Sequence, residues 1–411
     1  MAEQVSSLKT GIKYKDTPIG KIPVDWEVIS LRDVSEINMG QSPPSEDCNE
    51  REEGLPFYQG NAEFGSKYPS PKKWCEKPKK IADEGDILIS VRAPVGEINI
   101  APHKCCIGRG LAAITAKSIH SQFLYHLLFL RRKYLQKISQ GSTFEAINSK
   151  ELSDLLIFLP AVTEQKKIAE ILTTLDEAIE KTSQIIEKNK EAKKGLMQRL
   201  FTRGIGHKKF KKTEIGEIPV EWEVGEISDY GEILTGNTPP TNVPQYYGNE
   251  YPFVSPFDLG NKRIIRKTEK YLSKEGFAVA RALPANSVLV VCIGSTIGKT
   301  GIAGTELATN QQINSIICKN SDYNFVYYYA TFINQEFKQL AGTQAVPILN
   351  KGNFSKVKVA IPPLSEQKEI GGKLSAINEE IEKESDHKEQ MELLKKGLMQ
   401  VLLTGKIRVS V

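Results

Sequence analysis

Two short segments rich in glycine or proline could carry catalytic chemistry, and the first is GSTIGKT (294–300). It is similar to the phosphate-binding loop of nucleotide hydrolases, in which four residues separate the glycines and a helix follows. Here only three residues separate Gly294 from Gly298, and the following GIAGTELATNQQ is typical of loop and strand. The segment therefore predicts a tight glycine turn that presents Lys299 rather than a nucleotide site.

The second segment is a double proline that occurs twice, as SPPS (42–45) and TPPT (238–241). An amino-methyltransferase acting on DNA has an aromatic residue directly after its double proline, and the ring stacks on a flipped-out base. Ser45 and Thr241 stand where that ring would be. No glycine-rich cofactor loop follows a predicted strand either, so methyl transfer by this chain alone is not indicated.

Metal-dependent cleavage and nucleophilic catalysis lack a site in the sequence as well. A nuclease would need clustered carboxylates and a lysine around a metal ion. Asp86 and Glu97 flank a predicted strand, but ILISVRAPVG contains no lysine. The five histidines are scattered, and the six cysteines form no CxxC pair. We therefore expect no catalytic residues, no metal ligands and no cofactor bound by this chain.

The loops contain many side chains suited to nucleic acid. Lysine and arginine neutralise phosphates, while arginine, asparagine and glutamine can make paired hydrogen bonds to guanine or adenine edges. Any one of them is more often a solvated surface residue, so only the collective pattern favours DNA binding. The candidate DNA-binding residues are Gln41, Gln59, Asn61, Lys67, Lys72, Lys73, Arg92, Arg109, Asn237, Thr238, Lys262, Arg263, Arg266, Lys299, Gln311 and Gln312.

The composition is that of an ordinary globular protein. The 411 residues carry a net charge of +5, which permits nucleic-acid binding without arguing for it. No apolar run reaches the roughly 18 residues of a membrane span, and the N-terminus lacks the apolar core of a secretory signal. We therefore expect a cytoplasmic protein with reduced cysteines.

An internal repeat organises the chain. Residues 17–44 recur as 213–240 with 15 of 28 positions identical, and KKGLMQ (193–198) recurs unchanged at 395–400. Two copies cannot form a solenoid, which needs three or more repeats. The repeat instead predicts a pseudo-dimer on one polypeptide, with a target that also has two halves.

Each copy ends in a predicted long helix that begins at Thr163 or Ser365 as N-cap, with Glu164 or Glu366 in the first turn, where the helix dipole favours an anion. Apolar residues recur in a heptad pattern along both helices, which favours two antiparallel helices packed as a coiled coil over two isolated core helices. The predicted seam and partner-docking positions are Ile168, Leu172, Leu175, Ile179, Ile186, Leu196, Ile370, Leu374, Ile377, Ile381, Met391 and Leu398; Thr182, Asn189, Lys193, Leu200, Glu384, Lys388, Lys395 and Leu402 complete the register.

The block before each long helix predicts a mixed α/β domain. Short β-branched runs bounded by turn residues predict strands at 86–91, 110–116, 287–293 and 313–318. One amphipathic helix follows in each block, near 120–139 and 322–341. The fold class is therefore α/β (α+β), with an internal pseudo-twofold repeat.

These motifs together resemble the DNA-specificity subunit of type I restriction-modification systems, over nearly the whole chain. The motifs that carry the resemblance are IPVDWEV (22–28) and IPVEWEV (218–224), SVRAPVG (90–96) and GSTIGKT (294–300), GSTF (141–144), and the EQK helix start with KKGLMQ at the helix end, found twice. The first copy departs from the pattern at its end, with LFTRG (200–204) where the second has LLTG (402–405).

The resemblance implies target recognition domains at 1–160 and 204–362, and helical spacer regions at 161–203 and 363–411. It implies a non-catalytic subunit that binds double-stranded DNA with a bipartite site, two methylation subunits and two motor-nuclease restriction subunits. S-adenosylmethionine, ATP and Mg²⁺ are then expected on the partners. Two other hypotheses remain open: a self-contained DNA methyltransferase or nuclease with duplicated recognition domains, and a purely structural coiled-coil scaffold.

Overall fold

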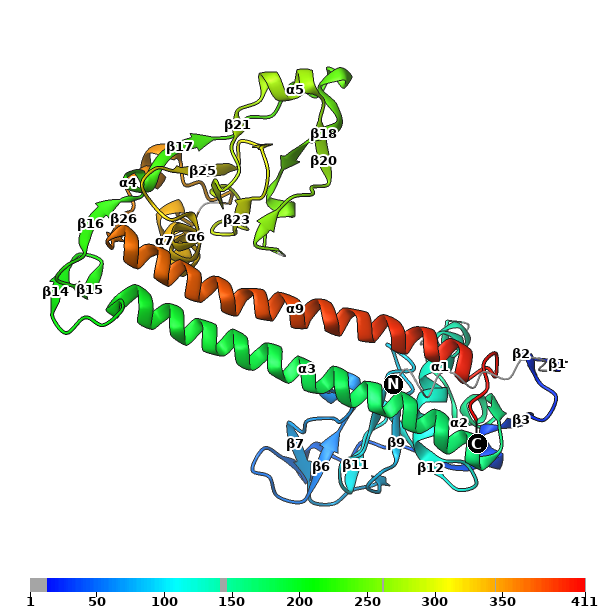
Figure 1. The fold of residues 1–411 in the computed structure, drawn as a ribbon. Coiled ribbons are helices and arrows are strands. Elements are labelled where there is room, and N and C mark those ends of the chain that lie inside the picture. Colours follow the sequence, from blue (N-terminus) through cyan, green and yellow to red (C-terminus); the bar gives the residue numbers. More distant parts are fainter. Residues whose placement is uncertain (1–12, 141–145, 261, 344, 411) are drawn as a thin grey trace. The chain divides into compact units, whose positions relative to one another are not determined.

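The computed structural model describes residues 13–140, 146–260, 262–343 and 345–410. The chain forms two compact units: unit 1 contains Met1–Gln184 and Ser385–Val411, and unit 2 contains Ile185–Glu384. Each unit combines one mixed α/β block with half of each long helix (Figure 1). The predicted fold class is confirmed. The GSTF segment (141–144) lies outside the described residues.

Unit 1 is built on two β-sheets in which most neighbouring strands are not consecutive in the sequence. The four-stranded sheet has the order β10-β9-β12-β4, and the five-stranded sheet has the order β5-β7-β6-β11-β8. Two-stranded pairs, β1-β2 and β13-β3, complete it. The elements are β1 (Tyr14–Thr17), β2 (Gly20–Pro23), β3 (Glu27–Ser30), β4 (Ser35–Met39), β5 (Cys48–Asn49), β6 (Leu55–Tyr58), β7 (Lys73–Cys75), β8 (Ile81–Ala82), β9 (Ile87–Ser90), β10 (Ile98–Ile100), β11 (Cys105–Ile107), β12 (Leu111–Ala116), α1 (Ser121–Ser139), α2 (Ser149–Ser153) and β13 (Leu156–Leu159).

Unit 2 repeats this topology. Its sheets have the orders β17-β25-β22-β23-β19 and β20-β18-β24-β21, with the pairs β14-β15 and β16-β26. The parallel pair β18-β24 corresponds to β6-β11 of unit 1. The elements are β14 (Phe210–Thr213), β15 (Gly216–Pro219), β16 (Glu223–Glu226), α4 (Ile227–Tyr230), β17 (Gly231–Thr235), β18 (Tyr247–Val254), β19 (Ile264–Ile265), β20 (Lys270–Leu272), α5 (Lys274–Val279), β21 (Ala282–Leu283), β22 (Val288–Val291), β23 (Thr300–Ala303), β24 (Leu307–Thr309), β25 (Ile313–Cys318), α6 (Tyr323–Phe332), α7 (Asn334–Ala341), α8 (Lys351–Ser355) and β26 (Lys358–Ile361).

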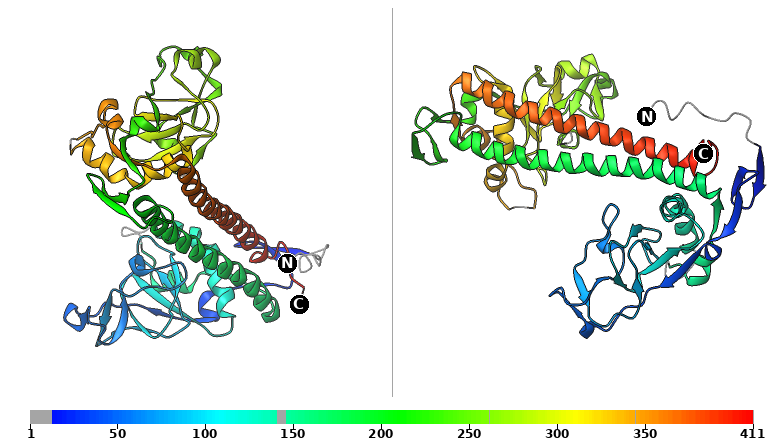
Figure 2. Two further views of the ribbon diagram at one scale, coloured as in Figure 1. Left: turned by 60° about the vertical axis from the view of Figure 1, so that its left-hand side comes forward. Right: turned by 60° about the horizontal axis from the view of Figure 1, so that its bottom comes forward.

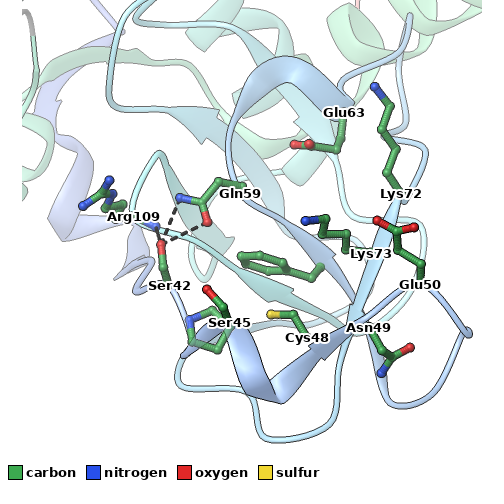
Figure 3. Close-up of a pocket in the computed structure, with 12 residues that line it drawn as sticks. Ser42, Ser45, Cys48, Asn49, Glu50, Gln59, Glu63, Lys72, Lys73 and Arg109 are labelled. Atoms are coloured by element: carbon green, nitrogen blue, oxygen red, sulfur yellow. Dashed lines mark hydrogen bonds between the residues drawn. The ribbon is translucent and has the colours of Figure 1, made fainter.

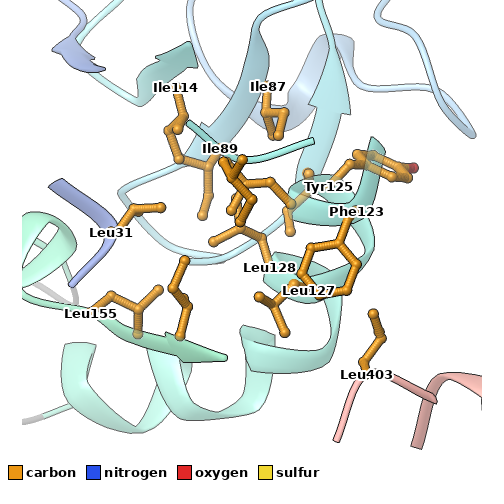
Figure 4. Close-up of a cluster of buried hydrophobic side chains, with 14 of the residues drawn as sticks. Leu31, Ile87, Ile89, Ile114, Phe123, Tyr125, Leu127, Leu128, Leu155 and Leu403 are labelled. Atoms are coloured by element: carbon orange, nitrogen blue, oxygen red, sulfur yellow. The ribbon is translucent and has the colours of Figure 1, made fainter. Parts of the chain in front are cut away.

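The four predicted strands are confirmed, as β9, β12, β22 and β25. Their nearly continuous apolar sequence follows from burial on both faces of the sheet. In β9, Ile87 and Ile89 join the core under α1, whereas Leu88 joins a second cluster on the opposite face. Figure 4 shows the first of these clusters, in which strand isoleucines meet Phe123 and the leucines of α1. A polar side chain in such a strand would therefore be buried in an apolar core, whichever face it pointed to.

The helix predicted near 120–139 is confirmed as α1, but the helix predicted near 322–341 is wrong as a single element. It is divided into α6 and α7 at Ile333, whose dihedral angles (φ −87°, ψ 17°) are not helical. Asn334 begins α7. Asparagine is a weak helix-interior residue because its side chain competes for backbone hydrogen bonds. The helical spacing of apolar residues continues on both sides of Ile333, so this spacing does not reveal the break.

The two long helices are α3 (Val162–Arg203) and α9 (Leu364–Leu402). In each unit a segment of α3 runs antiparallel to a segment of α9, and the two helices lie side by side in all views (Figures 1 and 2). Lys395 pairs with Asp176 in unit 1, and Lys193 binds Asn378 in unit 2. All twenty predicted register positions are buried or half-buried. Several belong to the hydrophobic cores of the units, Ile168 and Leu172 in unit 1 and Leu200, Ile370 and Leu374 in unit 2. Leu172, with no exposed surface, belongs to the core of unit 1 and offers nothing to a partner.

Both helices begin one residue before the predicted capping residue, because Val162 and Leu364 are already helical. The first-turn glutamate is a structural anchor rather than a simple dipole partner. Glu164 is 1% exposed and accepts a hydrogen bond from Trp26 Nε1 at 3.0 Å. Arg408 donates to both carboxylate oxygens of Glu164 and to both of Asp25. This cluster (Asp25, Trp26, Glu164, Arg408) connects the start of the recognition block, the start of α3 and the chain after α9 within unit 1.

Unit 2 has the corresponding cluster. Trp222 Nε1 donates to Glu366 at 2.8 Å, and His207 takes the place of Arg408, with Nε2 3.0 Å from each carboxylate oxygen of Glu366. The second nitrogen of His207 lies 3.0 Å from Glu221. The two clusters therefore use an equivalent tryptophan and glutamate with a different basic residue. Within the described ranges, no helix is long and apolar enough to cross a membrane.

Candidate nucleic-acid interface

A polar depression of about 600 Å³ lies in unit 1 between the loop after β4 and strands β6 and β7 (Figure 3). Ser42, Gln59 and Arg109 lie on one side of it, and Lys72 and Lys73 on the other. All but Ser42 are exposed. Four of the predicted DNA-binding positions and their anchor Ser42 thus converge from four segments that are far apart in the sequence.

The backbone brings these side chains together through two close approaches. The loop after β4 is held by Gly40 N–H donating to Leu111 at 2.9 Å. The turn between β11 and β12 has glycine on both sides of Arg109. A Cβ at Gly108 would lie 2.8 Å from the Gln59 side chain, and one at Gly110 would lie 2.7 Å from the Gln59 carbonyl. Only glycine allows the turn to approach Gln59 so closely.

Ser42 is the anchor of this group. Its hydroxyl lies 3.0 Å from Gln59 Oε1 and 2.9 Å from Gln59 Nε2, and it accepts from the backbone N–H of Arg109 at 3.2 Å. Among the described residues, the Arg109 guanidinium has no hydrogen-bond or ion-pair partner. The five N–H donors of Arg109 are therefore all available to a ligand. In SPPS (42–45), the serine that precedes the double proline is thus the anchor of this group.

The remaining chemistry of the depression fits binding better than catalysis. Glu50 and Glu63 also line it, so it is polar and of mixed charge rather than uniformly basic. Burial raises the pKa of the Cys48 thiol above its ordinary value, which disfavours the reactive thiolate. Across the described ranges, no group of three or more metal-ligating side chains was found.

Unit 2 carries the same arrangement with different side chains. Gly236 N–H donates to Ile313 at 3.1 Å, as Gly40 does to Leu111 in unit 1. The turn between β24 and β25 then presents Gln311 at the position of Arg109. Thr238, the counterpart of Ser42, donates its hydroxyl to Gln311 Oε1 at 2.7 Å. Asn310 and Gln312 hydrogen-bond each other beside it.

Two predicted DNA-binding residues have structural roles. Arg263 is 7% exposed and is bound by Asn324, Ser375 and Glu379. Asn237 is half-buried and uses both ends of its amide on the backbone, donating to Val279 and accepting from Arg281. Partners distant in sequence already bind both side chains, which disfavours a DNA contact for either; their assignment to DNA binding stays a prediction.

The other candidates lie outside the depression and its counterpart. Gln41, Arg92, Lys262, Arg266 and Lys299 are exposed, and Asn61 and Lys67 are half-buried. Lys67 lies over the ring of Tyr68, 5.5 Å from its centroid. Sequence reasoning did not select Ser42 as a functional residue. The signal was present, because a hydroxyl residue precedes the double proline in both copies.

The model of the type I restriction modification DNA specificity domain matches the chain twice, at residues 23–189 and 219–393. The chain belongs to this family. It is similar to the putative type I restriction enzyme MjaX specificity subunit of Methanocaldococcus jannaschii, with 33% identity over 97% of each chain. The MjaVIII specificity subunit of that organism is 29% identical over 95% of each chain.

Solved structures agree with this family fold. The crystal structure of the type I restriction-modification S subunit from M. genitalium superimposes with a TM-score of 0.66 and 12% identity, covering 92% of this chain and 96% of that one. A second structure, from work on complex assembly of the type I restriction-modification system, has a TM-score of 0.53 at 17% identity over 93% and 99%. In a chain of this DNA-specificity family, the depression of unit 1 and the equivalent turn of unit 2 are the candidates for contact with DNA.

Proposed function

We propose that this chain is the DNA sequence-specificity subunit of a type I restriction-modification complex, without an active site of its own. Each unit reads one half of an asymmetric, interrupted DNA site. The complex contains two methylation subunits and two motor-nuclease subunits, and it acts in the cytoplasm on the genome. S-adenosylmethionine, ATP and Mg²⁺ are bound by those partners.

One observation carries this proposal: equivalent turns in the two units present different base-reading side chains. Arg109 and Gln311 each follow the short strand that pairs in parallel with β6 or β18, and each contacts the hydroxyl residue before a double proline. Arginine pairs with guanine O6 and N7, whereas glutamine pairs with adenine N6 and N7. A shared framework with different readers is what an asymmetric bipartite target requires.

The long helices supply the surface for the methylation subunits in this proposal. The seam positions are used internally, but Leu393 and Leu394 on α9 in unit 1 are 71% and 49% exposed. Two adjacent exposed leucines on a helix surface favour a contact with another protein. We assign the methylation-subunit contact to this face of α9.

Methyl transfer tests the assignment of catalysis to the partners. The purified chain with tritiated S-adenosylmethionine should leave DNA unlabelled, and adding the methylation subunits should label it. Changing both Leu393 and Leu394 to aspartate should remove the methylation subunits on co-purification and abolish labelling, while Glu389→Ala, an exposed change on the same helix, should not. Labelling by the chain alone would refute the proposal.

In the proposed function, the pair of long helices also sets the length of the non-specific gap between the two half-sites. One added turn of α-helix is about 5.4 Å, more than the 3.4 Å rise of one base pair. Inserting one turn at matched points of α3 and α9 should therefore lengthen the gap by about one or two base pairs while both half-sites stay the same. Mapping the methylated sites measures this directly; an unchanged gap would contradict the spacer role.

A further inference from the structure

The GSTIGKT segment (294–300) forms a hairpin turn that has no part in the proposed base recognition by Arg109 and Gln311. It connects β22 to β23, and no helix follows it. Gly294 and Gly298 have φ of +91° and +86°, in the region that favours glycine. Val291 N–H donates to the carbonyl of Lys299 at 2.9 Å, which closes the turn. The predicted glycine turn that presents Lys299 is confirmed.

This turn covers a hollow of about 380 Å³ that α6 and α7 close from the other side. Gly298 packs directly on α7, because a Cβ there would lie 3.0 Å from that of Asn334. Lys299 and Lys338 both line the hollow, together with the hydroxyl residues Ser295 and Thr296. No acidic side chain lines it among the described residues, so its charge is positive.

The equivalent position in unit 1 is chemically different. The turn between β9 and β10 is closed by the same contact, from Ser90 N–H to the carbonyl of Glu97 at 2.8 Å. Gly96 packs on Arg132 of α1, and Arg132 forms an ion pair with Glu97. Unit 1 therefore neutralises this place internally.

The equivalent turn of unit 2 lacks that ion pair among the described residues. Lys299 replaces Glu97, and Asn334 replaces Arg132. In the described part of the chain, neither Lys299 nor Lys338 has a carboxylate partner. The charge at this position is reversed and left unpaired, and both ammonium groups are exposed. Unit 1 has the Arg132–Glu97 ion pair at this position, whereas unit 2 has two lysines without a carboxylate partner beside the hydroxyl groups of the hollow. The hollow of unit 2 therefore fits a ligand with anionic oxygen atoms.

We propose that this hollow is a phosphate-binding site and that its ligand is a phosphodiester of the DNA backbone. The assignment rests on the proposed function, since the DNA must be bound by unit 2. Lysine ammonium groups bind phosphate as mobile point charges, and hydroxyl groups donate hydrogen bonds to its oxygens. Such contacts fix the register of a protein on DNA without reading sequence. Unit 1 has no such contact at its equivalent turn.

The salt dependence of DNA binding tests this site. The probe is a duplex that carries a genomic site methylated by the complex, bound by the whole complex at several salt concentrations. Each phosphate contact contributes about 0.9 to the slope of log K against log salt. Changing both Lys299 and Lys338 to glutamine should remove one phosphate contact and lower the magnitude of that slope by about 0.9, with base preference unchanged. Lys319→Gln, which removes a lysine already paired with Glu232 at 3.0 Å, is the control and should leave the slope unchanged.

The outcomes separate the possible ligands. A slope that is equal in the double variant and in the control would overturn the proposal. If inorganic phosphate alone raises the melting temperature of the wild type but not of the double variant while the slope is unchanged, the hollow binds a free anion and the DNA assignment is wrong. A wild-type complex that shows no preference for its methylated site would instead refute the proposed function. Both lysines are exposed, so loss of folding is not expected to obscure the result.

Discussion

Replacing Arg109 with glutamine should change one base position in one half of the methylated sequence and leave the other half as it is. The guanidinium of Arg109 has no partner among the described residues, and its backbone N–H donates to Ser42. An arginine bound to guanine through two hydrogen bonds contributes about 1–3 kcal/mol of discrimination against other bases. Losing it should relax or switch a guanine at that position. Mapping methylated adenines in cells that express the variant with its partners measures the result.

Two matched variants sharpen this test. Lys72→Gln removes a positive charge from the same depression and should weaken binding for all sequences without changing the methylated motif. Gln311→Arg, the reverse exchange in unit 2, should alter the other half-site by replacing an adenine contact with a guanine contact. A motif that Arg109→Gln leaves untouched, or changes in both halves, would show that this turn does not read a base.

Replacing Glu164 with alanine should lower the free energy of unfolding of unit 1 by about 3–5 kcal/mol, the cost of breaking a buried ion pair. The carboxylate is 1% exposed and holds both Arg408 and the indole N–H of Trp26. Its removal leaves both donors without their partner. Urea unfolding followed by intrinsic fluorescence measures the change. Glu177→Ala, an exposed change on the same helix, should alter the free energy of unfolding by less than about 0.5 kcal/mol.

A double-mutant cycle identifies the contact responsible. If Arg408 and Glu164 act together, Arg408→Ala should cost much less when Glu164 is already alanine. Arg408 also lowers the pKa of Asp25 through hydrogen bonds. That contribution to stability is present above the ordinary aspartate pKa and is lost as pH falls through the lowered value. Arg408→Ala should therefore flatten the acid limb of the stability profile. Additive costs and an unchanged profile would contradict the cluster's role.

The fold was largely predictable because its signals are local. Strands β9 and β22 are short apolar runs between turn residues, and the heptad register of α3 and α9 continues over many turns. The repeat itself indicated two units. The break at Ile333 was not predictable from periodicity, since the buried face continues on both sides of it.

The site was less predictable because it depends on contacts between distant segments. Arg109 and Arg263 are both basic loop residues, and only the structure shows that Ser375 and Glu379, more than 100 residues later, bind Arg263. The role of Ser42 depends on the approach of Gln59 and the turn at Arg109. Arg408 could have been noted by extending the repeat past KKGLMQ, where His207 holds the matching place in unit 2.

Exchanging the block 17–159 for that of a relative with a different target, followed by mapping of all methylated adenines, tests most directly whether the two units read separate half-sites. If each unit reads its own half-site, one half of the methylated sequence becomes that of the donor, while the second half and the gap are retained. A change in both halves, or a motif identical to the original, would contradict the division of reading between unit 1 and unit 2.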